Sequence, residues 1–183
     1  MPHMYLELCA GTLEAQGHLS AIDRVRLAWH VVSAMAHVHD RGYLHYDLKM
    51  NNILVTMADG VWTVKVSDFG CARSVKKRNA TATEADAGKF PEVAAALQIA
   101  KTESAAPDLR CITRASDVYI FGKRVLSELF RTKLFPSSAT GAPHPMMAAR
   151  ALCGEKNPNS RPQFSELREL FYRYLKSAGA AAM

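Results

Sequence analysis

The sequence predicts one mainly α-helical domain that carries a small β-hairpin. Apolar residues recur at helical spacing in two long segments, residues 22–36 and 118–130. Two runs rich in β-branched residues, 53–57 and 61–66, flank an Asp-Gly turn at residues 59–60, and this arrangement is typical of a hairpin. The length of 183 residues suits a single domain, which can bury about 70% of the surface that its unfolded chain would expose.

Composition limits the class of protein. The net charge is +6, but the cations are scattered and their one dense run is residues 73–78, which favours a solvated loop or an acidic protein partner over nucleic acid. Four distant cysteines without a Cys-x-x-Cys pair indicate neither a zinc site nor a disulfide framework. The sequence has no apolar run long enough for a membrane and no signal segment at its start. We therefore expect an intracellular protein, cytoplasmic or nuclear, with no membrane partner.

The first elements follow from local signals. Residues 4–11 form an apolar run with one acid and a glycine at its end, which predicts a short strand and a turn. Ser20 is a typical N-cap and Asp23 places an acid in the first helical turn. The helix is expected to continue for about five turns to near Asp40 and to stop at Gly42.

Polar residues then gather on either side of the hairpin. Phosphoryl transfer needs cations for the phosphate oxygens and a carboxylate that faces the incoming hydroxyl. Asp47 can accept or orient that hydroxyl proton, and Lys49 can reach the phosphate. Asn52 and Asp68 offer the hard oxygen ligands that Mg²⁺ prefers. The hairpin places these residue types at the two ends of one antiparallel pair.

The pattern His-x-Asp-Leu-Lys-x-x-Asn, with Asp-Phe-Gly beginning 21 residues after Asp47, resembles the catalytic loop and the magnesium loop of eukaryotic protein kinases. The resemblance implies the helical C-lobe of the α+β kinase fold, with ATP and Mg²⁺ as cofactors and a protein substrate. It implies that Asp47 and Lys49 (catalytic loop 45–52) act on the acceptor hydroxyl and the phosphate. A lysine at position 49 implies a Ser/Thr rather than a Tyr hydroxyl.

The same resemblance assigns further roles. Residues 4–11 become the hinge, where Glu7 and Cys9 contact adenine through their backbone, and Leu54 forms the floor beneath it. The remaining assignments are structural, and they comprise His45 stacked on Phe69, Gly70 in the magnesium loop 68–70, and Asp117 bracing the backbone of the catalytic loop.

An activation segment is expected from residue 68 to about residue 108, with an extra helix in residues 92–101. Two acids could end this segment, Glu92 in Phe-Pro-Glu and Asp108 in Ala-Pro-Asp. We favour Asp108, because it precedes Asp117 by 9 residues while Glu92 precedes it by 25. Arg161, in Asn-Pro-Asn-Ser-Arg-Pro, is expected to pair with this acid. An amphipathic helix from residue 164 should close the domain, which covers residues 1–176 and leaves a disordered tail at 177–183.

The sequence also departs from the kinase pattern. Residues 130–146 are too few for the additional helix and loop that help kinases dock protein substrates. Tyr46 stands where many kinases have the Arg that receives the phosphate of a modified activation loop, so loop phosphorylation should be a weak switch. The first lysine of the chain is Lys49, so no strand lysine and no Gly-rich loop precede the hinge. We therefore expect a C-lobe without an N-lobe.

Two functions follow. The chain is a Ser/Thr protein kinase whose N-lobe is encoded upstream or supplied by a partner chain. Alternatively, it is a catalytically inactive C-lobe that holds a kinase, a substrate or an acidic partner as a scaffold.

Overall fold

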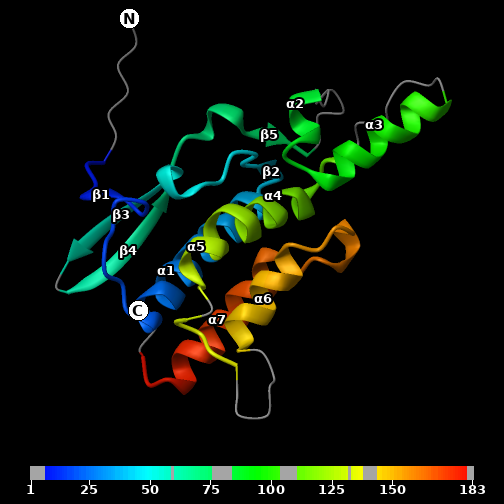
Figure 1. The fold of residues 1–183 in the computed structure, drawn as a ribbon. Coiled ribbons are helices and arrows are strands. Elements are labelled where there is room, and N and C mark those ends of the chain that lie inside the picture. The colour runs from blue at the N-terminus through cyan, green and yellow to red at the C-terminus, as the bar shows by residue number, and fades with distance from the viewer. Residues whose placement is uncertain are drawn as a thin grey trace, which may run out of the picture.

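A computed structural model describes residues 7–58, 60–75, 84–103, 111–131, 133–137 and 144–180. Helices dominate this part of the chain, as predicted, and they are α1 (Ala21–Asp40), α2 (Glu84–Ala87), α3 (Pro91–Glu103), α4 (Arg114–Ile120), α5 (Ser127–Leu129), α6 (Pro145–Cys153) and α7 (Phe164–Ser177). Five short strands accompany them, β1 (Gly11–Thr12), β2 (Tyr43–Leu44), β3 (Ile53–Ala58), β4 (Val61–Val66) and β5 (Arg73–Ser74) (Figure 1). No helix among the described residues is long and apolar enough to cross a membrane.

The predicted first helix is confirmed as α1. The side chain of Ser20 accepts a hydrogen bond from the backbone N–H of Asp23 at 3.2 Å, so one orphan donor of the first turn is satisfied. Beyond Asp40 the chain turns at Gly42, whose φ of 78° suits glycine. The buried face of α1 is apolar and includes Val25, Leu27, Ala28, Val31, Val32, Met35 and Ala36.

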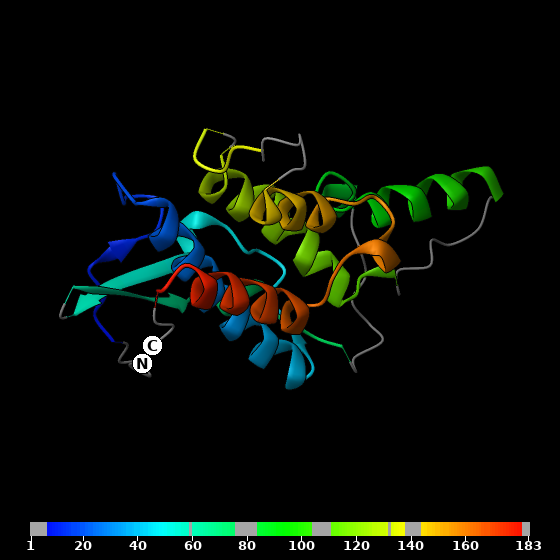
Figure 2. The ribbon, with the colours of Figure 1, turned by 90° about the horizontal axis from the view of Figure 1, so that it is seen from below.

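Helix α7 lies beside α1 and covers much of this face (Figure 2). Its buried side is aromatic, with Phe164 and Phe171 in the core, and Trp29 of α1 contacts the Tyr172 ring. Burying such rings removes a large apolar area from water and stabilises the pair of helices.

A second helical run crosses the core as α4, a π-helical segment (Phe121–Leu126) and α5. Gly122 in the π-helical segment lies against α6, where a Cβ atom would come within 2.6 Å of the Cβ of Cys153. The two segments can therefore approach this closely only with glycine at position 122. Cys153 is fully buried in the same contact.

The predicted hairpin is confirmed as β3 and β4, which pair antiparallel with Ile53 opposite Val66. The strand predicted for residues 4–11 is wrong for Glu7 to Ala10, although Gly11 does lie in a strand. Glu7 to Ala10 are not in a strand, and β1 consists of Gly11 and Thr12 beside β3. A strand needs hydrogen bonds to the edge of a neighbouring strand, and an apolar run alone does not supply them. The side chain of Leu8 in this run is 93% exposed.

Helix α3 confirms the extra helix expected in the activation segment, and its far end extends away from the other helices in both views (Figures 1 and 2). Residues 177–180, expected to begin a disordered tail, instead close α7, because the N–H of Ala178 donates to the carbonyl of Tyr174 at 3.0 Å. The rest of that predicted tail, residues 181–183, lies outside the described residues.

Candidate active site

Asp117, at the start of the second helical run, holds the catalytic loop. Its carboxylate accepts hydrogen bonds from the backbone N–H groups of His45 and Tyr46, each at 2.8 Å. The ring of His39 lies 2.9 Å from the same carboxylate, and Asp117 is only 1% exposed. The bracing role predicted for Asp117 is confirmed.

Backbone strain gathers in the two loops. Tyr46 and Asp68 are the non-glycine residues with positive φ in the described part of the chain, at 72° and 60°. Such a conformation is costly for a bulky residue and persists where neighbouring contacts hold it, often at functional sites. The bonds to Asp117 hold Tyr46, and the N–H of Gly70 bonds to the carboxylate of Asp68 at 3.3 Å.

The carboxylate of Asp47 lies between two cations. Nζ of Lys49 is 2.6 Å from one oxygen, and Nη1 of Arg124 is 3.4 Å from the other. Partial burial raises the pKa of Asp47, but the hydrogen bond and charge of Lys49, with the charges of Lys89 and Arg124, outweigh it and lower the pKa below its ordinary value. The carboxylate is therefore ionised at neutral pH and able to orient a hydroxyl.

Asn52 precedes β3 and Asp68 follows β4, at adjacent ends of the paired strands. The N–H of Ser67 donates to the carbonyl of Asn52 at 2.8 Å. Asp68 is the residue after Ser67, so this bond brings its backbone near Asn52. The side-chain NH₂ of Asn52 donates to the carbonyl of Asp47 at 2.9 Å, which leaves its amide oxygen as an acceptor. The amide oxygen of Asn52 and the carboxylate of Asp68 are hard oxygen donors of the kind that Mg²⁺ prefers. Phosphate oxygens would supply further ligands.

His45 and Phe69 stack below this pair. Their ring centroids are 4.8 Å apart, and the His45 ring also meets the carbonyl of Ser67 at 2.9 Å. The predicted contact of these rings is confirmed, and it joins the catalytic loop to the magnesium loop. Phe69 keeps 46% of its surface exposed.

The residues predicted to contact adenine lie on β3, the middle strand of its sheet, and in the chain ahead of β1. Leu54 on β3 is paired with Thr12, and the N–H of Ala10 donates to the carbonyl of Val55 at 3.0 Å. The chain after Cys9 thus runs beside Leu54. The side chain of Glu7 points to the surface, where it pairs with Lys65 at 2.5 Å.

Tyr46 is buried in the core. Its ring is 2% exposed, contacts Phe90, and carries the guanidinium of Arg73 at 4.2 Å from its centroid. Burial, with the neighbouring carboxylate of Asp86, raises the pKa of the Tyr46 hydroxyl, so the hydroxyl is neutral. The Tyr46 ring therefore holds the Arg73 guanidinium by a cation–π contact.

Arg161 pairs with Glu92. Its two terminal nitrogens lie 3.0 and 2.9 Å from the two oxygens of Glu92 in a bidentate contact, and the pair is buried. The remaining three N–H groups donate to the carbonyls of Ala115, Glu155 and Lys156. All five donors of the guanidinium are thus in use.

The choice of Asp108 as the partner of Arg161 was therefore wrong, although the predicted ion pair itself is confirmed. The short spacing between Asp108 and Asp117 favoured the wrong acid. Helix α3 lies between Glu92 and Asp117 and lengthens the connection from the correct one. Asp108 lies outside the described residues. Ser116 also donates to Glu92 at 2.6 Å, so the acid ties the segment to α4 as well.

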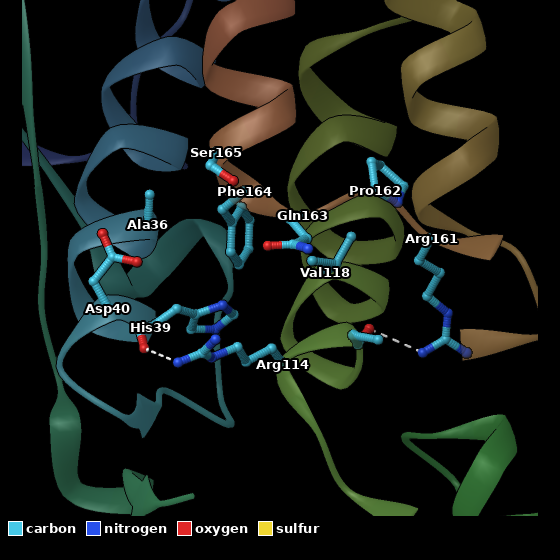
Figure 3. A pocket seen from close by; sticks show the side chains of 11 residues that line it. Ala36, His39, Asp40, Arg114, Val118, Arg161, Pro162, Gln163, Phe164 and Ser165 are labelled. Carbon is cyan, nitrogen blue, oxygen red and sulfur yellow. Dashed lines mark hydrogen bonds between the residues drawn. The ribbon is translucent and has the colours of Figure 1, made fainter. Parts of the chain in front are cut away.

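A small pocket of about 60 Å³ lies where α1 ends and α4 and α7 begin (Figure 3). Arg114 bridges it by donating to the carbonyl of His39 at 2.7 Å, while Arg161 reaches the carbonyl of Ala115. The two arginines thus link the end of α1 to the starts of α4 and α7. The contact of His39 with Asp117 also joins α1 to α4.

Sequence reasoning missed Arg124 and His39. Arg124 belongs to a segment whose apolar spacing predicted a buried helix, so its contact with Asp47 gave no local signal. A charged pair at positions 123–124 in an otherwise apolar run was the available clue. His39 was not assigned to the site either, and its buried ring lies 2.9 Å from the carboxylate of Asp117.

Known proteins resemble this chain over most of its length. A family model of the protein kinase domain matches residues 2–176. The chain is 25% identical over 174 residues to a probable serine/threonine-protein kinase of Dictyostelium discoideum. The aligned region covers 85% of this chain and 38% of that protein. It is 31% identical over 180 residues to ephrin type-A receptor 8 of Rattus norvegicus, covering 86% of this chain and 46% of the receptor.

A third relative, ephrin type-A receptor 5 of Gallus gallus, is 28% identical over 179 residues, which cover 88% of this chain and 17% of the receptor. The chain thus spans less than half the length of each of these relatives. The family match covers both loops and the helices that hold them. The chain belongs to the protein kinase family.

Proposed function

We propose that this chain transfers a phosphoryl group from ATP to Ser or Thr hydroxyls of proteins. The observation that carries the proposal is the setting of Asp47, an ionised carboxylate with Lys49 at 2.6 Å, on a loop that buried Asp117 holds in a strained conformation. Such preorganisation places charge where the reaction needs it.

Each residue has a role in this proposal. Asp47 accepts a hydrogen bond from the substrate hydroxyl and aligns its oxygen with the phosphorus. Lys49 moves from Asp47 toward the oxygens of the transferred group, since its side chain is 39% exposed and free to swing. Bound Mg²⁺, held by Asn52 and Asp68, would neutralise phosphate charge.

The choice of Ser or Thr rests on Lys49, which matches the catalytic-loop pattern of Ser/Thr kinases in the resemblance above. One relative carries serine/threonine-protein kinase in its name. Peptides that differ only in having Ser, Thr or Tyr as acceptor would decide between the hydroxyls.

We further propose that full activity needs an N-lobe, upstream in the same protein or on a partner chain. The nucleotide contacts assigned to this chain come from Glu7 and Cys9 ahead of β1, and from Leu54, Asn52 and Asp68 on the hairpin and the loops at its ends. The lysine that pairs with ATP phosphates in kinases has no counterpart among residues 1–48 of this sequence.

Transfer of radiolabelled phosphate from ATP with Mg²⁺ to a Ser/Thr peptide tests the function. We expect transfer by the 183-residue chain to rise when a kinase N-lobe is added, and to vanish with Asp47→Asn. The matched control Asp40→Asn, an exposed acid at the end of α1, should leave the rate unchanged. Equal transfer by Asp47→Asn and the unaltered chain would overturn the assignment of Asp47.

The scaffold alternative is favoured by the same lack of a counterpart to that lysine among residues 1–48. A chain that never transfers phosphate, with or without an added N-lobe, yet binds a partner kinase with unchanged affinity in the Asp47→Asn variant, would support the scaffold.

A further inference from the structure

Cations crowd the acceptor side of the catalytic loop. Lys49 and Arg124 contact the two oxygens of Asp47. Lys89 lies close by, with its Nζ 5.8 Å from the centroid of the Tyr46 ring, and its charge also acts on Asp47. Three cations therefore act on Asp47, while Asp68 acts on Lys49 and Asp86 acts on the neighbouring Tyr46.

The charge continues into a neighbouring hollow. A hollow of about 390 Å³ lies between the π-helical segment and α6, and Lys123, Ser127, Met147 and Arg150 are among its lining residues. None of the described residues that line it is acidic. Two acids adjoin the lining residues along the chain, namely Glu128, which is paired with Arg131 at 2.5 Å, and Glu155, which is exposed beside Gly154.

The hollow and Asp47 are linked through two consecutive residues of the π-helical segment. Lys123 lines the hollow, and Arg124, the next residue, contacts Asp47. Consecutive side chains of a helix point in different directions, so a peptide that contacts both places has to cross this helical turn. Both side chains are exposed, and Arg124 keeps donors beyond the Nη1 group that meets Asp47.

We propose that Lys123, Arg124 and Arg150 form an acceptor-side basic surface that binds acidic residues flanking the substrate hydroxyl. The inference rests on the proposed function and gives it a substrate class, namely protein segments rich in Asp, Glu or phosphorylated residues around the acceptor. Cations of this kind steer and orient acidic peptides, and Arg adds directed hydrogen bonds to carboxylates. A basic residue beside the acceptor would be repelled.

Arg124 is then a specificity-determining residue. While no substrate is present, its guanidinium rests on Asp47 at 3.4 Å. An acidic side chain of the substrate offers a second carboxylate within reach, so Arg124 can hold the peptide while Asp47 takes the hydroxyl. The role differs from that of Lys49, which belongs to the catalytic loop itself.

Fluorescence anisotropy tests the surface without nucleotide. The probes are labelled peptides of equal length in which one Ser is flanked by Glu, by Gln or by Lys. We expect the Glu peptide to bind the 183-residue chain about tenfold or more tightly than the Gln peptide. Raising the salt should erase most of this preference, because exposed charges are screened.

Two variants locate the effect. Lys123→Glu should abolish the preference for the Glu peptide, and Arg124→Gln should reduce it without adding an acid beside Asp47. The matched control Lys176→Glu carries the same charge change on exposed α7 and should keep the preference. Far-ultraviolet circular dichroism shows whether each variant is folded.

Outcomes separate the inference from the proposed function. Transfer of phosphate to Gln and Glu peptides at equal rates, with equal binding, overturns the inference and leaves the kinase assignment intact. Tight binding of the Glu peptide without transfer in any condition supports the surface and counts against the kinase assignment. A third outcome is that a single-stranded oligonucleotide binds, that Lys123→Glu abolishes this binding, and that the Glu peptide does not bind. That outcome assigns the surface to nucleic acid and overturns the inference.

Discussion

At the scale of single residues, Asp117 joins three parts of the molecule at one buried point. Its carboxylate accepts hydrogen bonds from two backbone N–H groups of the catalytic loop and contacts the ring of His39 on α1. A buried donor that loses its acceptor costs the full desolvation of that group. The geometry of the loop therefore depends on a residue that lies some 70 positions away in the sequence.

Asp117→Ala should lower the free energy of unfolding by about 3 kcal/mol, since three buried donors lose one acceptor. For a chain of this size that corresponds to a fall in Tm of roughly 6 to 12 °C. Differential scanning calorimetry measures it, with Asp40→Ala as the exposed control. A Tm equal to that of the unaltered chain would contradict the bracing role.

At the scale of elements, the buried pair of Glu92 and Arg161 ties the start of α3 to the turn before α7. Burial raises the pKa of Glu92, but hydrogen bonds from Arg161 and Ser116 outweigh it and lower the pKa below the ordinary 4.5. A lowered pKa means that the ionised pair stabilises the fold above this pH, and that the stabilisation is lost as the pH falls through the pKa of the folded state.

Glu92→Gln should therefore cost about 3 to 5 kcal/mol at pH 7, because it leaves the buried guanidinium without its counter-charge. Urea unfolding at a series of pH values checks this. The difference from the unaltered chain should begin to shrink as the pH falls below about 4.5, where the unfolded chain takes up the proton, and should be lost once the pH falls through the lower pKa of Glu92 in the folded state. Glu169→Gln, in an exposed pair on α7, serves as the control and should show no such trend.

The contact between the π-helical segment and α6 permits a second test at this scale. Gly122→Ala would bring a methyl group within 2.6 Å of the Cβ of Cys153, and neither backbone can yield easily. We expect a loss of about 1 to 3 kcal/mol in urea unfolding at pH 7. Gly17→Ala meets nothing within 4 Å and should change stability little. Equal stability of the two variants would mean that the helices can separate without cost.

At the scale of the whole molecule, local signals predicted most of the fold. Ser20 marks the start of α1, and the Asp-Gly turn marks the hairpin, because caps and turns act within a few residues. The partner of Arg161 and the reach of Arg124 to Asp47 depend on how distant segments meet, so spacing misplaced the first and gave no sign of the second. The two loops were found because their chemistry constrains residue types.

The nucleotide contacts that we propose would leave one side of the ligand open, so water would screen the charges that hold the phosphates. We expect the 183-residue chain to bind ATP with Mg²⁺ no better than about millimolar. Ligand at its own Kd then adds only about 0.4 kcal/mol of stability, which thermal-shift titration can detect. A large shift at micromolar ATP that Asp68→Asn abolishes would show that the phosphate contacts are complete without an N-lobe.

The close contact at Gly122 also affects chemical reactivity. Burial raises the pKa of the Cys153 thiol to about 12, and its side chain is shielded from solvent, whereas Cys71 is exposed. Alkylating reagents attack the thiolate, so at neutral pH they should modify Cys71 quickly and Cys153 only when α6 parts from the π-helical segment. The rate at which Cys153 is labelled therefore measures how often this pair of helices opens, with no probe added to the chain.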